Sequence, residues 1–261
     1  MTERRNLRDA WDLADPRGSE ERFRALLENA EAEYALEIST QIARAVGLQG
    51  DFEAARRLLD EVEAELTDTT PVARLRWLLE RGRVHNSSGD PEAARSFFAD
   101  AWEFGRAIPN PGLAVDAAHM LAIVAPPGER NEWNQAAVDY AQAAGDSEAL
   151  RWLGSLYNNI GWDAHDRGDY EAALTAHQQA EAWQREHGTP VDLRIATWSV
   201  AKQLRHLGRT AEALAIQQAL LEEYLAEEPG GEGFVHEEIA EILHAAGDAK
   251  RARPHSARGL E

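Results

Sequence analysis

The stretch that decides the fold is Gly168-Asp169-Tyr170-Glu171-Ala172-Ala173, a six-residue phrase that recurs with variations along the chain. Variants of the same phrase begin at Gly50, Gly89, Gly208 and Gly247. The five glycines are separated by 39, 79, 40 and 39 residues, so the longest interval equals two periods. Because a fixed period of this kind is typical of repeat architectures, the phrase predicts turns near residues 50, 89, 168, 208 and 247, and a lengthened one near 128.

Small side chains recur at two fixed distances from each of these glycines. Seven residues before the glycine stand Ala43, Gly82, Gly161, Ala201 and Ala240. Five residues after it stand Ala55, Ala94, Ala173, Ala213 and Ala252. Small residues let two helices joined by a tight turn pack with their axes about 8 to 10 Å apart. Since Ala, Leu, Glu and Arg dominate nearly every segment and strand patterns are nearly absent, the pattern predicts an all-α chain of antiparallel helix pairs.

The best copy of the repeat resembles the tetratricopeptide repeat family. It combines Tyr157, the pair Ile160-Gly161, the phrase at Gly168 and a later Ala180. The period of 39 to 40 residues exceeds the usual length of about 34 residues, which makes this an extended form of the repeat. The resemblance implies a right-handed superhelical solenoid of about six helix pairs.

The region before the first repeat is expected to cap the solenoid. We assign residues 1–31 to an N-terminal segment with a capping helix and residues 32–261 to the solenoid. Ser19 is expected to cap that helix, residues 15–18 to break the chain before it, and Trp11 to anchor the segment. Composition does not change within 32–261, so it indicates no further domain boundary.

Composition and charge exclude several classes of protein. The 261 residues carry a formal charge of −19, have a mean hydropathy of −0.51 and contain no cysteine. Disulfides, thiolate metal sites and a cysteine nucleophile are therefore excluded. The charged N-terminus lacks the apolar stretch of a signal peptide, which predicts a cytoplasmic protein. The negative balance opposes binding to nucleic acid or to an anionic membrane.

No motif predicts catalysis, a cofactor or a metal. The glycine-rich stretch Gly230-Gly231-Glu232-Gly233 follows no strand and is interpreted as a loop. Asp116 and His119 stand one helical turn apart, as do Glu241 and His244, but the two pairs are three repeats apart and cannot share one metal ion. We therefore predict a non-enzymatic protein without a cofactor.

Candidate contact residues follow from the resemblance, which implies that the first helix of each pair lines a concave groove. Positions thirteen, ten, six and three residues before each turn glycine share one helix face, and in the irregular third repeat the same positions are counted from residue 129. Over all six repeats these positions sum to a charge of +1. Such a groove would hold a peptide with acidic groups, with amides on its backbone and tryptophan as an apolar wall. The candidates are Arg44, Arg83, Asn86, His119, Asn158, Asn159, Trp162, His165, Trp198, Lys202 and Arg205.

Other interpretations of the same residues stay open. Charged residues on a helix face usually form pairs within the protein, which applies to Arg44, Arg83, Lys202 and Arg205. Trp162 and Trp198 can also belong to the core between repeats, which is the more common place for tryptophan at helical spacing. For function, the leading hypothesis is a peptide-binding scaffold or adaptor. The alternatives are a homodimer formed through a terminal repeat, a peptide-sensing regulator, and an enzyme that uses His119 or His165 with a nearby carboxylate.

Overall fold

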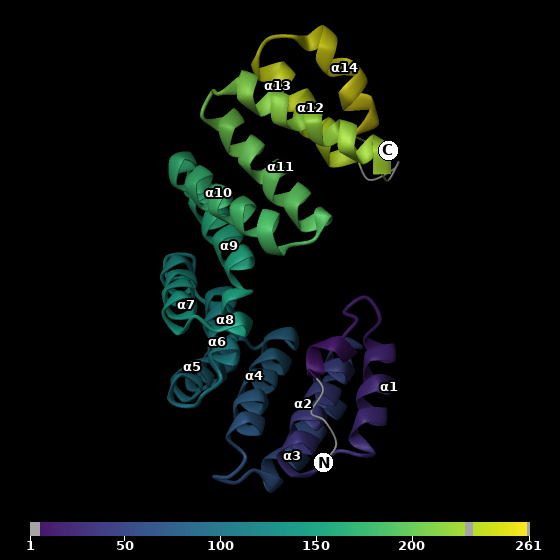
Figure 1. Cartoon of the computed structure of the whole chain (residues 1–261), viewed down its shortest axis with the longest axis vertical. Helices are drawn as coiled ribbons and strands as arrows, with labels where there is room; N and C mark the ends of the chain where they lie inside the picture. The colour runs from purple at the N-terminus through teal and green to yellow at the C-terminus, as the bar shows by residue number, and fades with distance from the viewer. Residues whose placement is uncertain (1–5, 228–231, 260–261) are drawn as a thin grey trace. The chain divides into compact units, whose positions relative to one another are not determined.

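The computed structural model describes residues 6–227 and 232–259, all of which lie in helices or in the segments that connect them (Figure 1). This confirms the prediction of an all-α chain of helix pairs. The chain divides into two compact units, Met1–Leu150 and Arg151–Glu261. They are called unit 1 and unit 2.

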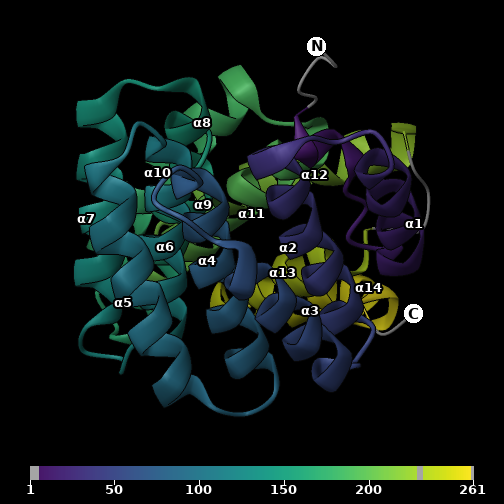
Figure 2. The ribbon, with the colours of Figure 1, turned by 90° about the horizontal axis from the view of Figure 1, so that it is seen from below.

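Unit 1 contains one 3-10 helix and eight α-helices in its described part. They are η1 (Leu7–Ala10), α1 (Pro16–Leu27), α2 (Ala32–Leu48), α3 (Phe52–Glu65), α4 (Pro71–Ser87), α5 (Pro91–Ala107), α6 (Pro111–Val124), α7 (Arg130–Ala144) and the short α8 (Ser147–Leu150). Helices α2 and α3, α4 and α5, and α6 and α7 pack as consecutive pairs, and Figure 2 shows the pairs following one another. The N-terminal segment packs onto α2 through α1.

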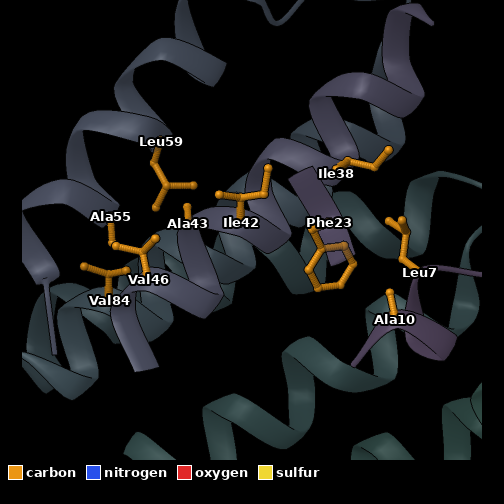
Figure 3. Packing of buried hydrophobic residues seen from close by; sticks show 10 residues of the cluster. All are labelled: Leu7, Ala10, Phe23, Ile38, Ile42, Ala43, Val46, Ala55, Leu59 and Val84. Carbon is orange, nitrogen blue, oxygen red and sulfur yellow. The ribbon is translucent and has the colours of Figure 1, made fainter. Parts of the chain in front are cut away.

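The start of unit 1 is held by an apolar cluster that Figure 3 shows from close by. Phe23 of α1 is fully buried and packs with Leu7 and Ile38 in this cluster. Trp11 contacts Phe23 edge to face, with ring centroids 5.0 Å apart, and its Nε1 donates to Gln41 at 3.0 Å. Trp11 therefore anchors the segment as predicted.

The first helix begins earlier than the sequence interpretation placed it. Asp15 caps α1 by accepting a hydrogen bond from the backbone N–H of Gly18, and Pro16 occupies the first helical turn. Proline suits this position because its missing N–H would have no helical partner there. Ser19 is instead buried within α1 and bonds the backbone of Asp12 in both directions, at 2.8 Å. The predictions that Ser19 is the cap and that residues 15–18 break the chain were wrong.

Unit 2 continues the alternation of first and second helices. Its described helices are α9 (Leu153–Asp166), α10 (Tyr170–His187), α11 (Pro190–His206), α12 (Thr210–Glu227), α13 (Gly233–Ala245) and α14 (Ala249–Arg258). Helices α9 and α10, α11 and α12, and α13 and α14 form consecutive pairs. Six helix pairs are thus present in the part of the chain that the structure describes, as predicted.

The recurring phrase forms the tight turn between the helices of a pair. Its glycines have φ between 74° and 91°, a left-handed conformation that favours residues without a Cβ: Gly50, Gly89, Gly168, Gly208 and Gly247. In four copies the next residue caps the second helix by accepting from the backbone N–H three positions on: Asp51, Asp90, Asp169 and Asp248. Glycine reverses the chain and aspartate starts the next helix.

The irregular third turn lies between α6 and α7, where it was expected near residue 128. Ala122 is buried on α6, as the small-residue pattern requires. On α7, however, the fully buried small residue is Ala137, whereas the expected Ala136 is partly exposed. The turn is thus one residue longer than the sequence suggested.

The contact between the two helices of a pair changes chemically from unit 1 to unit 2. Nine residues after four of the turn glycines stand side chains that are fully buried: Leu59, Phe98, His177 and Gln217. The ring of Phe98 lies over Gly82 in unit 1, and the ring of His177 lies over Gly161 in unit 2. Polar side chains therefore fill core positions in unit 2 that apolar side chains fill in unit 1.

Candidate functional site

The candidate residues of unit 1 belong to a network of ion pairs between first helices. Arg83 of α4 donates to Glu80 at 2.7 Å and to both oxygens of Asp116 of α6, at 2.6 and 2.7 Å. Arg44 of α2 lies 3.8 Å from the same Glu80, and its guanidinium is 5.1 Å from the Trp11 ring centroid. Two basic candidates therefore neutralise two acids of the protein itself.

The pKa values of this network follow from burial and from the opposite charges. Burial alone would raise the pKa of Asp116, but Arg83 and Arg44 outweigh it and lower that pKa. Burial likewise opposes the charge of Arg83, but Asp116 and Glu80 raise its pKa above the ordinary value. Burial lowers the pKa of His119, despite the opposing effect of Asp116. These shifts favour the charged forms of Asp116 and Arg83, which pair with each other, and the neutral form of His119.

Unit 2 repeats this arrangement with different residues. Glu238 of α13 is 2% exposed and accepts from Arg205 of α11 at 2.5 Å and from Lys202 at 3.4 Å. Exposed Glu241 lies 4.0 Å from Arg205. The four basic candidates of the two units thus form pairs within the protein, the second of the two interpretations that the sequence left open.

The acids at the centre of these networks were missed by the sequence interpretation, although the repeat register marks them. Glu80 and Glu238 each stand nine residues before a turn glycine, whereas Arg44 and Lys202 each stand six residues before the preceding one. A basic residue six positions before one turn glycine therefore contacts an acid nine positions before the next turn glycine. The two residues lie on neighbouring first helices, as Arg44 and Glu80 do in unit 1 and Lys202 and Glu238 do in unit 2.

A second group of candidates forms an aromatic surface on the first helices of unit 2. Trp162 of α9 and Trp198 of α11 have ring centroids 6.2 Å apart, and Phe234 of α13 meets Trp198 edge to face at 6.0 Å. Ile195, one helical turn before Trp198, is 47% exposed, and Phe234 is 37% exposed. We call these four residues, Trp162, Ile195, Trp198 and Phe234, the aromatic face. It carries large apolar side chains that the protein only partly covers.

Cationic and polar candidates border the aromatic face. The Lys202 ammonium lies 4.9 Å from the centroid of the Trp198 ring. His165 contacts Trp162 edge to face, and its Nδ1 is 2.8 Å from Oε1 of Gln203. Asn158 and Asn159, on α9 with Trp162, are both partly exposed. The structure therefore brings most of the unit 2 candidates together on α9 and α11.

The unit 1 candidates Asn86 and His119 lie on α4 and α6 and are partly exposed. Arg83, three residues before Asn86 on α4, is paired with Glu80 and with Asp116. A separate hollow of about 410 Å³ lies on α1, α2 and α3 and is lined by Glu20, Arg24, Val46, Gln49, Asp51, Ala54, Arg57, Leu58 and Glu61. Its arginines are paired with acids one helical turn away on their own helices, so it offers no converging group for a ligand.

The described residues carry neither a metal-binding cluster nor a membrane-spanning helix. Residues 6–227 and 232–259 contain no group of three or more His, Cys, Asp or Glu side chains placed to hold a metal ion. In the same residues, no helix is both long enough and apolar enough to span a bilayer. The two carboxylate–histidine pairs noted in the sequence therefore remain separate features of α6 and α13.

These helix pairs, turns and small contact residues define an all-α helical repeat protein. Residues 153–182, which cover α9 and the first part of α10, match the model of the tetratricopeptide repeat. The protein is a repeat protein of the tetratricopeptide type, as the resemblance implied. None of the curated proteins matches the chain significantly in sequence.

Several solved structures share the fold at low sequence identity. A signal transduction ATPase with numerous domains from Pyrococcus horikoshii, which has a tetratricopeptide repeat sensor, is 12% identical with a TM-score of 0.77. That match covers 94% of this chain but 38% of the ATPase chain. The apo form of RapI is 12% identical with a TM-score of 0.75, over 97% of this chain and 72% of RapI. A Rap protein in complex with Competence and Sporulation Factor is 17% identical with a TM-score of 0.57, over the same shares of the two chains.

Proposed function

We propose that this protein is a non-enzymatic scaffold that holds a segment of a partner protein on the aromatic face of unit 2. The observation that carries the proposal is the exposure of Ile195 and Phe234 beside Trp198. Large apolar side chains that lie together on the solvent-exposed surface of a protein are typical of binding sites. Tryptophan is enriched among the residues that contribute most of the binding energy. Tetratricopeptide-type folds generally serve as non-catalytic scaffolds, and one Rap neighbour is complexed with Competence and Sporulation Factor.

The chemistry of the aromatic face favours a partner segment with apolar anchor residues. Side chains of the partner would pack against Ile195 and Phe234, with Trp198 between them, while Asn158 offers a donor and an acceptor to a peptide backbone. Lys202 and Arg205 lie at the border, where Glu238 and Glu241 balance their charges. Apolar side chains rather than acidic groups are therefore the main determinant of binding here.

A peptide selection with matched variants tests the proposal. Peptides are selected from a random display library against the full chain, and their affinities are measured by fluorescence anisotropy. We expect selected peptides to contain aromatic or large aliphatic residues, and the double variant Ile195→Ser/Phe234→Ser to bind them at least about tenfold more weakly. Leu225→Ser is the control, because Leu225 of α12 is 48% exposed but lies outside the face.

Two results would overturn the proposal. The first is selected peptides whose affinity is unchanged in the double variant. The second is an equal loss in Leu225→Ser, which would indicate non-specific adhesion to exposed apolar side chains. Circular dichroism of each variant shows whether its helices are retained, and Trp162→Phe, which keeps an aromatic ring, provides a milder second test of the same surface.

A further inference from the structure

The last described helix, α14, carries a cluster of positive charge on one side. Lys250, Arg251, Arg253 and Arg258 are all exposed, whereas Ala252 is the one buried residue of this helix. At 100° per residue, the four cations fall on the side of α14 that points away from Ala252. We call these four residues the cationic face. These four residues contribute +4 to the formal charge of −19, so all other residues together contribute −23.

Most of these cations have no partner within the described chain. Nearly every other described Lys or Arg makes an ion pair, a side-chain hydrogen bond or a contact with an aromatic ring. In residues 6–227 and 232–259, the exceptions are Arg8, Lys250, Arg253 and Arg258. Three of the four unpaired cations thus stand on one helix of ten residues. Arg251 pairs with its own helix cap, Asp248, at 3.6 Å.

Helix stability does not explain the placement of Lys250 and Arg251. The N-terminal turn of a helix favours negative charge, because the helix dipole is positive there. The corresponding turn after the other phrase glycines contains an acid: Glu53, Glu92, Glu171 or Glu212. In α14 this turn has Lys250 and Arg251 and no acid. The first turn of the second helix is therefore basic in the last repeat, whereas in the other four copies it contains the acid that the helix dipole favours.

Two histidines lie where α14 packs against α13. Nδ1 of His255 on α14 lies 2.8 Å from Nδ1 of His236 on α13. The pKa of His255 is lowered by burial, by His236 and by Arg258 and Arg251. The pKa of His236 is lowered by burial and by Arg258. Both shifts favour the neutral imidazole, so the positive charge of α14 resides on the cationic face.

We propose that the cationic face of α14 is a second interaction surface, which binds a short acidic segment of a partner protein. The length of an anionic partner distinguishes an acidic peptide from a nucleic acid or a membrane surface. A ten-residue helix is about 15 Å long, and charges are screened beyond about 8 Å at physiological salt. A short acidic peptide contacts α14 alone, whereas a long nucleic acid or a membrane surface also meets the acidic remainder of the chain.

Binding of a defined acidic probe tests this surface. The probe is fluorescein-labelled octaglutamate, titrated with the full chain at low salt and followed by fluorescence anisotropy. The test variant is Lys250→Glu/Arg253→Glu/Arg258→Glu, which changes exposed side chains that have no partner among the described residues. The control variant Arg17→Glu/Arg57→Glu/Arg185→Glu changes the net charge equally at exposed sites, with side chains 83%, 60% and 57% accessible.

We expect the test variant to bind octaglutamate about tenfold more weakly and the control variant to bind within about twofold of wild type. Raised salt should weaken wild-type binding. Lys250→Gln/Arg253→Gln/Arg258→Gln keeps the experiment decisive if charge reversal disturbs α14. Equal losses in the test and control variants, or no binding to wild type, would overturn the proposal. Tighter binding to octathymidylate, or to phosphatidylserine vesicles, would overturn the assignment to an acidic protein segment.

Discussion

Arg83 donates to both carboxylate oxygens of Asp116 across neighbouring first helices, at 2.6 and 2.7 Å. Because Arg83 also bonds Glu80 on its own helix, one cation neutralises two acids that have little contact with solvent. Glu238 in unit 2 has the complementary role and accepts from two cations. Arg83, Lys202 and Arg205, which were predicted to contact a partner, therefore connect neighbouring repeats of the protein itself.

Replacing Arg83 by glutamate should unfold part of unit 1 rather than only weaken binding. The new carboxylate would lie beside Glu80 and Asp116, and uncompensated buried charge costs about 3 to 5 kcal/mol. Hydrogen exchange of α4 and α6 amides measures the loss. Arg57→Glu is the control, because Arg57 and its partner Glu53 are both exposed, and it should cost less than about 1 kcal/mol. Equal protection of α4 and α6 in both variants would contradict the role of Arg83.

This prediction changes how a binding experiment should be designed. A variant that reverses Arg83 would lose a partner through unfolding, whichever surface the partner uses. The exposed residues Ile195 and Phe234 avoid this difficulty, because neither side chain belongs to an ion-pair network.

His177 should make unit 2 sensitive to acid. The ring is fully buried, and neither nitrogen has a hydrogen-bond partner among the described residues. Burial, with a smaller contribution from His165, lowers its pKa from 6.5 to about 4. As pH falls below 6.5 the unfolded chain takes up a proton that the folded chain does not, so stability decreases until about pH 4. The full decrease is about 3 kcal/mol.

His177→Leu tests the acid sensitivity, because Leu59 occupies the corresponding position in unit 1. The variant should be more stable than wild type at pH 7, since two unpaired buried nitrogens are removed. The difference in stability between the variant and wild type should grow as the pH is lowered from 6.5 to about 4. Hydrogen exchange of α9 and α10 at pH 7 and pH 5 provides the measurement. An advantage that is the same at both pH values would show that His177 does not titrate as described.

Gly161 should be intolerant of a methyl group. A Cβ at Gly161 would come 2.6 Å from the His177 ring, whereas a Cβ at Gly47 would find its nearest neighbours at 3.7 Å. Gly161→Ala should therefore cost about 1 to 3 kcal/mol through overpacking, and Gly47→Ala should stabilise α2 by up to about 1 kcal/mol. Thermal unfolding compares the two. Adding His177→Ala to Gly161→Ala should recover part of the loss if the clash is its cause.

The turns and helix pairs were predictable because their signals are local. A glycine with positive φ and a following aspartate cap act within four residues, so Gly168 and Asp169 reveal their turn directly. The start of α1 was missed because Pro16 is compatible with a break and with a first helical turn, and the sequence interpretation took the break. The structure resolves this through the hydrogen bond that the backbone N–H of Gly18 donates to the side chain of Asp15.

The candidate site was predictable in part. The repeat register placed Trp162, Trp198 and Lys202 on first helices, and the structure confirms that they lie near one another. Whether a cation such as Arg83 is available to a partner depends on the side chains of the next repeat, more than thirty residues away. That information is present in the register but becomes clear only when the pairs are seen in space.

Glu238 should matter more to unit 2 than its neighbour Glu241, although both face Arg205. Glu238 is 2% exposed and accepts from Arg205 and Lys202, whereas the Glu241 side chain is 59% exposed and 4.0 Å from Arg205. Glu238→Gln removes the buried counter-charge of both cations and leaves only the exposed Glu241 near Arg205, which should cost about 3 kcal/mol. Glu241→Gln should cost less than about 0.5 kcal/mol.

The same substitution separates the structural role of these charges from a role in binding. With Glu238 neutralised, Lys202 and Arg205 become available at the border of the aromatic face, so Glu238→Gln should strengthen binding of peptides that carry an acid next to an aromatic anchor. Hydrogen exchange of α11 and α13 measures the structural cost, and anisotropy with selected peptides measures the gain. Loss of protection without a change in peptide affinity would show that Lys202 and Arg205 do not contact the peptide. A gain in affinity without loss of protection would show that Glu238 modulates binding but does not hold α11 to α13.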